Sequence, residues 1–444
     1  MQALKEAMSS FGNSQAIVSG NSDITYEKLL SEQALWVDRF TQAGVSRGSV
    51  TALQADYSAE GVAALLALME LKAICVPLSP LPEAKRQEFL QVSSAEHVVD
   101  LHASTPATTP TGQRADHELY ARLRELESAG LVLFSSGTTG RSKASVLNLE
   151  SLVEAHIGER KRPRRTMTFL NFDHIGGVNT LMHALAHGGT VITTPRRTPD
   201  DVLRTVQETQ VQVLPTTPTF LTMCLIGQKL RDYDLSSLQV ITYGTEPMPE
   251  QTLKKLHEEL PNVQLKQTYG LSELGIMSTK SRSDDSLWVK LGGAGFDYKV
   301  IDGLLWVKSD KAMLGYLNAA YSFDEDGYFN TQDQVEVDGE YVKILGRRSE
   351  LINVAGLKVY PNEVESVILE VPNVADVTVF GRKNPVTGQV VQARVKPVDG
   401  NAATDLEKAV LKHCGDRLED YKVPVRVEIS EEAHHSNRFK KARA

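Results

Sequence analysis

The chain has 444 residues, of which 41% are apolar and 23% are charged, and its formal net charge at pH 7 is −8. This length is more than one hydrophobic core usually serves, so we expect at least two domains in a globular protein of ordinary composition. The acidic balance argues against general nucleic-acid binding, and no apolar run is long enough to span a bilayer.

Short β-branched runs alternate with helical patterns from about residue 47. We expect a strand at 49–53, a helix over 59–69 and a strand at 73–77. Further strands are expected at 131–134, 166–170, 190–193, 211–214, 239–242 and 263–267, with helices such as 200–208 and 249–259 between them. Such alternation is typical of parallel sheets covered by helices. A polar loop rich in proline and threonine interrupts the pattern at 102–116.

The pattern changes after about residue 286. Short strands with tight turns are expected at 304–308, 334–337 and 340–345, and Asp338-Gly339 is a hairpin signal. A smaller unit follows, with a helix from Pro361, strands at 374–380 and 390–396, and a helix over 404–413. We therefore place a domain boundary at 346–350.

The strand at 131–134 runs directly into a segment of glycines and hydroxyls that ends in a lysine: Ser135, Ser136, Gly137, Thr138, Thr139, Gly140, Arg141, Ser142 and Lys143. Glycines let backbone N–H groups approach an anion, hydroxyls add donors and lysine adds charge, so the segment predicts a phosphate site. It is not the loop of nucleoside triphosphatases, which needs four residues between its glycines, whereas two separate Gly137 and Gly140. This spacing disfavours a kinase or an ATPase.

The segment resembles the signature of the adenylate-forming superfamily, which includes acyl-CoA synthetases, peptide-synthetase adenylation domains and firefly luciferase. Further motifs of that family follow in its order, from about residue 24 to the end. The resemblance implies an α/β fold with a large N-terminal domain of parallel sheets flanked by helices, plus a distorted barrel. It places this adenylation core at 1–345, a hinge at 346–350 and a small mobile α+β lid at 351–444.

Two motifs carry the implied adenine and magnesium sites. Tyr269, Gly270, Leu271, Ser272 and Glu273 resemble the family's Tyr-Gly-x-Thr-Glu segment, in which the tyrosine stacks on adenine and the glutamate holds Mg²⁺. A carboxylate is a hard ligand that suits Mg²⁺, which offsets phosphate charge. The upstream run Tyr243-Gly244-Thr245-Glu246 resembles the segment whose backbone lines the adenine pocket.

Asp333 lies in a run that resembles the family's Thr-Gly-Asp motif, with Gln332 in place of the usual glycine. A carboxylate accepts hydrogen bonds, so the resemblance assigns Asp333 to the ribose hydroxyls. Arg347 keeps the family's Gly-Arg and would support ribose or phosphate. Ser349 stands at the hinge position, where the family commonly has aspartate or lysine.

The smaller unit carries the implied thiol and lysine functions. Ala355, Gly356 and Lys358 lie in the segment that resembles the family's thiol tunnel, where glycine lets a pantetheine arm pass close to the backbone. The closing run 436–443 resembles the family's lysine motif, which assigns Lys440 as the catalytic lysine and leaves Lys441 as a rival. An ammonium is needed there because a carboxylate must attack an anionic phosphate.

The implied nucleotide-binding set is Ser135, Ser136, Gly137, Thr138, Thr139, Gly140, Lys143, Gly244, Thr245, Glu246, Tyr269, Gly270, Ser272, Asp333 and Arg347. The implied catalytic residues are Lys440, Glu273 and Thr138, and the implied metal ligand is Glu273. The implied acid pocket consists of His174, Ile175, Gly177, Thr217, Tyr243 and Gly244.

Ile175 decides between classes of acid. Amino-acid-activating relatives place an aspartate at this position to pair with an α-ammonium, and isoleucine cannot neutralise a buried charge. We therefore expect a fatty or aryl acid without an α-amino group, although Asp173 close by keeps the alternative open.

The expected activity is ATP- and Mg²⁺-dependent formation of acyl-AMP, followed by transfer to coenzyme A. A carrier-protein phosphopantetheine is the alternative acceptor, and a non-catalytic nucleotide-binding protein is the rival of another class. The basic run 160–165 is typical of a solvated loop, and the alternative is a binding site for a phosphorylated cofactor or an acidic carrier protein. Isolated cysteines and the absence of an apolar leader favour the cytoplasm. The sequence leaves the oligomeric state open.

Overall fold

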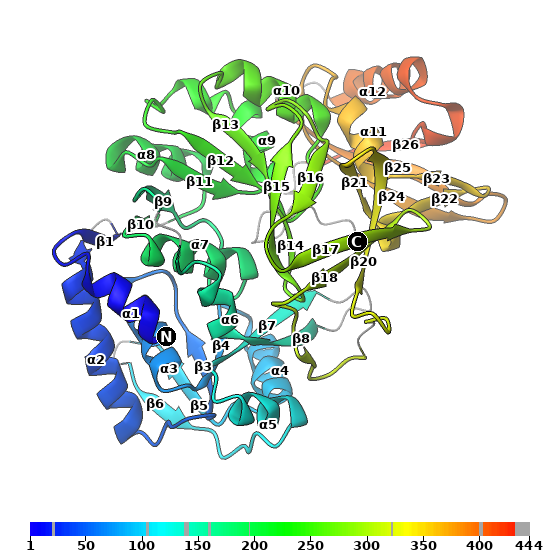
Figure 1. Cartoon of the computed structure of the whole chain (residues 1–444). Helices are drawn as coiled ribbons and strands as arrows, with labels where there is room; N and C mark the ends of the chain where they lie inside the picture. The colour runs from blue at the N-terminus through cyan, green and yellow to red at the C-terminus, as the bar shows by residue number, and fades with distance from the viewer. Residues whose placement is uncertain are drawn as a thin grey trace.

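The computed structural model describes residues 1–19, 23–103, 106–136, 142–158, 161–194, 196–320, 323–398 and 403–430. It is a mixed α/β protein with three seven-stranded sheets and one five-stranded sheet, in a large N-terminal part and a small C-terminal part (Figure 1). The expected fold class is confirmed. None of the helices in these ranges is both long and apolar enough to cross a membrane.

The first sheet is parallel at its centre and antiparallel at its edges. Its order is β19 (Gly315–Tyr316), β8 (Ser142–Asn148), β7 (Gly130–Ser136), β4 (Ile74–Leu78), β3 (Val50–Gln54), β5 (His97–Asp100) and β6 (Thr108–Pro110). The helices in this stretch of the chain are α1 (Gln2–Ser9), α2 (Tyr26–Gln42), α3 (Ala59–Glu70), α4 (Glu83–Ser93) and α5 (Glu118–Glu125).

Helix α3 shows why this part folds as layers. Its residues 61–69 are all buried, and a helix that is apolar on every side must lie inside the protein. Ser58 caps it by accepting a hydrogen bond from the Gly61 N–H at 3.0 Å. The helix belongs to a core that it shares with α2 and α7 (Ile175–Ala186), between the two parallel sheets.

The second sheet is parallel except at β2. Its order is β13 (Gln264–Gln267), β12 (Val240–Tyr243), β11 (Val213–Thr216), β9 (Arg165–Met167), β10 (Thr190–Ile192), β1 (Gln15–Val18) and β2 (Ile24–Thr25). The apolar side chains of α8 (Pro199–Thr209), α9 (Pro218–Ile226) and α10 (Glu250–Glu259) share one core with it. Those of α7 (Ile175–Ala186) and α6 (Leu149–Glu154) belong to the core between the sheets.

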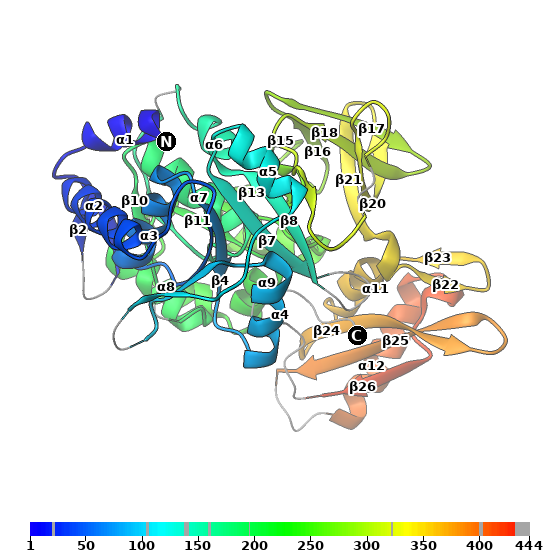
Figure 2. The ribbon, with the colours of Figure 1, turned by 90° about the horizontal axis from the view of Figure 1, so that it is seen from below.

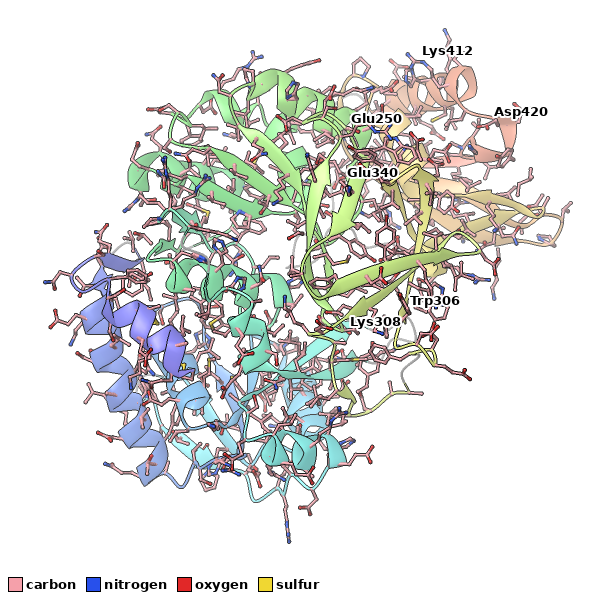
Figure 3. The ribbon with its side chains drawn as sticks, viewed as in Figure 1. Glu250, Trp306, Lys308, Glu340, Lys412 and Asp420 are labelled. Atoms are coloured by element: carbon pink, nitrogen blue, oxygen red, sulfur yellow. The ribbon has the colours of Figure 1, made fainter. Side chains whose placement is uncertain are left out.

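The third sheet is antiparallel throughout and lies in the region of the expected barrel. Its order is β14 (Tyr269–Leu271), β15 (Gly275–Ser281), β16 (Val289–Gly292), β21 (Tyr341–Arg347), β20 (Phe329–Asp338), β18 (Leu304–Ser309) and β17 (Phe296–Ile301). Figure 3 shows Trp306 and Lys308 on β18 of this sheet.

The small C-terminal part has its own apolar core, formed by residues between 352 and 429. It contains β22 (Ile352–Val354), β23 (Leu357–Val359), α11 (Pro361–Ile368), β24 (Val374–Asn384), β25 (Gly388–Pro397), α12 (Ala403–Arg417) and β26 (Arg426–Ile429). It lies beside the third sheet and away from α1–α3 (Figure 2). Lys412 and Asp420 point outward from its rim (Figure 3).

The predicted strands and helices are present, with bounds that differ by a few residues. One local prediction was wrong, because the loop predicted at 102–116 includes the short edge strand β6. Strand β8, in which the chain returns after the glycine segment, was not predicted. Lys143 therefore lies on a strand, paired with Ser135.

Candidate active site

Lys143, Tyr316 and Glu273 form one continuous group. The Tyr316 hydroxyl donates to Oε1 of Glu273 at 2.5 Å, and the Lys143 ammonium lies 5.1 Å from the centre of the Tyr316 ring. Burial raises the pKa of the Tyr316 phenol, and the Glu273 carboxylate raises it further, so the phenol remains a donor. The turn that carries Glu273 is held by its carbonyl, which accepts from the Met313 N–H at 2.7 Å.

Tyr269, Asp333 and Arg347 form a second group. The Tyr269 hydroxyl donates to Oδ2 of Asp333 at 2.6 Å, and Nε of Arg347 lies 3.0 Å from Oδ1. The β20–β21 pairing sets Asp333 directly opposite Arg347. Burial raises the pKa of Tyr269, and the Asp333 carboxylate adds to the effect. Asp333 raises the pKa of Arg347 by its charge.

Arg347 connects the two groups electrostatically. After Asp333, its pKa also responds to Tyr269 and Glu273, and Arg347 in turn lowers the pKa of Tyr316. Two carboxylates, two neutral phenols, one guanidinium and one ammonium are thus gathered where the first and third sheets meet. Both carboxylates are buried, at 9% exposed for Glu273 and 7% for Asp333. Buried carboxylates with cations beside them are typical of a site for a charged ligand.

Gln332 explains why the family has glycine beside the aspartate. Its φ is +61°, in the left-handed region that costs a side-chain-bearing residue about 1–2 kcal/mol. The side chain itself is exposed. The bend is fixed locally, because the Gln332 N–H donates to Asn330 and the Asp333 N–H donates to the Thr331 hydroxyl.

The segment 243–246 is strained and tightly packed. A Cβ on Gly244 would lie 2.6 Å from the carbonyl and hydroxyl oxygens of Thr268, so only glycine fits there. Thr245 has φ +76°, which is unusual for a β-branched residue, and its buried hydroxyl has no hydrogen-bond partner. Strain of this kind is found mostly at functional sites. Glu246 accepts from the Thr219 N–H at 2.8 Å and so caps α9.

The predicted acid-pocket residues surround the starts of two helices. His174 caps α7 by accepting from the Gly176 N–H at 2.9 Å, and the side chain of Ile175 is buried. A Cβ on Gly177 would lie 2.1 Å from the Asn171 carbonyl oxygen, so the helix can approach this loop only at a glycine. Thr217 is fully buried and caps α9 through the Phe220 N–H.

Tyr243 lies at the end of β12 with its side chain 1% exposed. Burial raises the pKa of its phenol, whose oxygen has no hydrogen-bond partner. Its side chain packs in the core beneath α8–α10. Thr217 and Tyr243 therefore use their side chains in the fold.

Ala355, Gly356 and Lys358 are not brought to this cluster. They are exposed at the tip of the β22–β23 hairpin, whose two turn residues have φ of +50° and +90°. The Ala355 N–H donates to the Thr387 carbonyl at 2.8 Å, inside the small part. Ser349 is exposed in the short turn after Arg347, and Ser272 is half-buried in the turn before Glu273.

Gly270 lies on β14, paired with Ile276 on β15, and the predicted residues still to be placed lie partly outside the described ranges. Those outside are Gly137, Thr138, Thr139, Gly140, Lys440 and Lys441. Ser135 and Ser136 end β7, opposite Lys143 and Ser142 on β8, and of these four residues Lys143 has its ammonium over the Tyr316 ring.

Two residues of the site were not predicted from the sequence. Tyr316 links Lys143 to Glu273, and Asn318 fixes the start of β8 by donating to the Ser142 carbonyl at 2.8 Å and accepting from the Ala144 N–H at 3.1 Å. The one available signal was the Gly-Tyr-Leu-Asn run at 315–318, a tight turn that carries a hydroxyl and an amide.

Two family models match the chain. A family model described as AMP-binding enzyme matches residues 4–317, and one described as AMP-binding enzyme C-terminal domain matches residues 363–440.

Curated relatives are similar over most of the chain. An indoleacetate–CoA ligase of Aromatoleum aromaticum is 30% identical over 68% of this chain, and the alignment covers 63% of that protein. The long-chain-fatty-acid–CoA ligase FadD13 of Mycobacterium tuberculosis is 28% identical over 94% of this chain and 92% of its own. A 2-succinylbenzoate–CoA ligase of Bacillus cereus is 26% identical over 94% and 92%.

Solved structures share the fold. The anthranilate CoA ligase AuaEII, in complex with anthranoyl-AMP, superposes with a TM-score of 0.83 at 19% identity, over 99% of this chain and 95% of that one. The o-succinylbenzoate CoA synthetase of Bacillus subtilis gives 0.76 at 21% identity, over 99% and 96%.

Proposed function

Because the chain belongs to the AMP-binding enzyme family, we propose that it is an acid–thiol ligase. It joins a carboxylic acid to ATP as acyl-AMP with release of pyrophosphate, and then transfers the acyl group to the thiol of coenzyme A. The observation that carries the proposal is the convergence of Lys143, Tyr316 and Glu273 with Tyr269, Asp333 and Arg347.

Each member of the cluster has a role that its chemistry suits. Lys143 and the glycine segment hold phosphate, because backbone N–H groups and an ammonium are matched to an anion. Asp333 accepts from the ribose hydroxyls, with Arg347 and Tyr269 fixing the orientation of its carboxylate. The Tyr269 ring forms the wall for adenine.

Glu273 fits Mg²⁺ as a shared ligand. Within the described residues no three His, Cys, Asp or Glu side chains come together as a metal cage. Mg²⁺ is usually held by one or two carboxylates and substrate phosphates, which is the arrangement a single buried glutamate beside a phosphate loop provides. Bound there, the ion would offset phosphate charge during attack by the acid. Tyr316 holds the glutamate in place.

The acid lies between the start of α7 and the segment at Gly244. Ile175 gives this end of the pocket an apolar wall with no partner for an α-ammonium. Indoleacetate, long-chain fatty acids and 2-succinylbenzoate, named for the relatives, all lack an α-amino group, which supports the same class of acid here.

The thiol step uses the small part as a lid. We place the adenylation core at 1–345, the hinge at 346–350 around Ser349, and the lid from 351 on. A separate core in residues 352–429 supports movement as one body. Rotation about the hinge would replace Lys440 at the site by the hairpin tip with Ala355, Gly356 and Lys358. A carrier-protein phosphopantetheine in place of coenzyme A is the alternative acceptor.

Acid-dependent pyrophosphate release tests this function directly. The protein is incubated with ATP, Mg²⁺ and fatty, aryl or amino acids, with and without coenzyme A. We expect release with acids that lack an α-amino group, and an acyl-CoA product when coenzyme A is added. No release with any acid, or ADP as the product, would rule the function out.

A further inference from the structure

Helix α7 presents a half-exposed stripe that leads away from the proposed acid site. Gly176, Asn179, Thr180, His183 and Ala186 are its half-buried residues, while the intervening positions are buried in the core between the sheets. These five positions fall on one side of a helix with 3.6 residues per turn. The stripe begins beside His174 and Ile175, and His183 lies roughly 10 Å further along, at 1.5 Å per residue.

A row on the second sheet belongs to the same region. Pro215, Thr242 and Lys266 are in register on β11, β12 and β13, and all three are half-exposed. Their neighbours in register Leu214, Ile241 and Leu265 face the opposite side and are buried beneath α8–α10. Strand β15 contacts both β13 and α7, which brings the row and the stripe to the same part of the fold. The charge of Lys266 contributes to the lowered pKa of His183.

Three histidine rings are gathered at the far end of the stripe. The His183 ring centre lies 4.5 Å from that of His187 and 5.5 Å from that of His156. Nδ1 of His187 lies 2.7 Å from the His183 carbonyl and donates to it, since a carbonyl only accepts. His187 is only 7% exposed, and its other nitrogen, Nε2, is buried without a hydrogen-bond partner.

Cations contribute to the electrostatics of these rings. After burial and the neighbouring histidines, Lys161, Arg164 and Lys266 lower the pKa of His183, and Lys161 and Lys311 lower that of His156. They come from the loop before β9, from β13 and from the turn after β18, so three separate segments contribute charge there. Asp310 is the acid that acts on Lys311. Figure 1 shows α7 with α6 and β15 beside it, and contacts join α7 to both.

A cluster of this composition is matched to an anion. Neutral imidazoles donate N–H groups, and the lysines and arginine supply charge that a carboxylate would neutralise. An apolar acyl tail would instead leave the Nε2 of His187 without a partner and bury part of Lys266 and Lys311 against hydrocarbon, which is costly.

We propose that His183, Lys266 and the surrounding histidines and cations receive a second anionic group at the distal end of the acid substrate. This inference rests on the proposed function, because the distal end is defined relative to the reacting carboxylate near Gly244. The substrate class is thus dicarboxylic acids, or acids with an equivalent distal anion, whose two ends are separated by roughly 10 Å, the rise of α7 from Gly176 to His183.

Matched pairs of acids test the inference. Pyrophosphate release is measured with hexanoate and hexanedioate, octanoate and octanedioate, decanoate and decanedioate, and with phenylalkanoates and their para-carboxylated forms. We expect at least one diacid to exceed its monoacid partner by about tenfold or more in kcat/KM, the gain expected of a hydrogen bond to a charged group. If every monoacid equals or exceeds its diacid, the inference is wrong while the ligase function stands. If no acid causes pyrophosphate release, the proposed ligase function itself is wrong.

Two variants tie the preference to the cluster. Lys266→Met removes the charge at nearly constant size, and His183→Leu removes the imidazole. Each should raise the KM of the preferred diacid about tenfold or more and leave kcat with the monoacid unchanged, which also shows that the variant is folded. Lys280→Met, an exposed lysine on β15, is the matched control and should change neither acid. A diacid preference that survives both cluster variants overturns the proposal.

Discussion

The hydroxyl of Tyr316 donates a 2.5 Å hydrogen bond to Glu273, 43 residues away along the chain. Tyr316 lies on β19, which pairs with β8, whereas Glu273 lies in the turn between β14 and β15. The bond therefore ties the phosphate side of the site, on the first sheet, to the proposed magnesium ligand, on the third. Because both side chains are buried, this contact fixes where the glutamate carboxylate points.

Tyr316→Phe tests that connection. Loss of the hydroxyl removes the donor that holds Glu273, which costs roughly 1–2 kcal/mol, or about five- to thirtyfold in kcat/KM for ATP. The measurement is acid-dependent pyrophosphate release at varied ATP and Mg²⁺. Tyr328→Phe is the control, because it removes a similar phenol–carboxylate bond, to Asp297, on an exposed part of the third sheet. Equal loss in both variants would refute a specific role for Tyr316.

Gln332→Gly should stabilise the protein. Glycine adopts φ of +61° without the side-chain penalty, and although it loses more entropy on folding, the net gain is about 0.5–1 kcal/mol. Urea unfolding measures the change, and Gln332→Ala serves as the control, because alanine keeps the Cβ and should bring no gain. A glycine variant less stable than the alanine variant would contradict the backbone strain assigned to this position.

Stability should fall between neutral and mildly acidic pH because of His156 and His183. Burial lowers the pKa of His156 to about 3 and that of His183 to about 4, with the nearby histidines and cations adding to the effect. An unfolded histidine titrates near 6.5, so below that pH the unfolded chain binds more protons than the folded one. The stabilisation present above pH 6.5 is therefore lost as pH falls, by up to about 1.4 kcal/mol per unit for each residue.

The free energy of unfolding at a series of pH values between 7 and 4.5 measures this slope. His156→Gln and His183→Gln should each flatten it, since glutamine does not titrate. His102→Gln is the control, because His102 is exposed. If the slope of unfolding free energy against pH is unchanged in both His156→Gln and His183→Gln, these imidazoles do not cause the pH dependence.

Lys440→Ala should abolish acyl-AMP formation and leave transfer from supplied acyl-AMP to coenzyme A largely intact. The ammonium is needed where two anions meet, and loss of one such electrostatic group costs roughly 2.7–4 kcal/mol, or about a hundredfold to a thousandfold. Lys441→Ala is the matched control one residue away. If Lys441→Ala causes the larger loss, the assignment of the lysine moves by one position.

The fold could be predicted from the sequence where the signal is local. The apolar run of α3 and the alternation of strands and helices depend on neighbouring residues, so their positions were correct within a few residues. Strand β8 was missed because the glycine segment before it reads as the start of a loop. It forms a strand because it pairs with β7, and this pairing cannot be predicted from the neighbouring residues in the sequence.

The candidate site could likewise be predicted from the sequence only in part. The motifs that contain Asp333 and Glu273 were recognised, and the structure brings both into one cluster with Lys143 and Arg347. Tyr316 and Asn318 were missed because their partners Glu273 and Ser142 lie 43 and 176 residues away, and only the folded sheets bring them together. The distal cluster was missed for the same reason, since His156, His183 and Lys266 come from three distant segments.

The most direct test of the account is exchange of labelled pyrophosphate into ATP in the absence of any thiol. If the cluster joins a carboxylate to the α-phosphate, exchange requires an acid, requires Mg²⁺, and falls strongly in Asp333→Asn and Lys440→Ala. We expect acid-dependent exchange, and AMP, not ADP, as the product once coenzyme A is added. Exchange that proceeds equally without an acid, or no exchange with any acid that lacks an α-amino group, would contradict it.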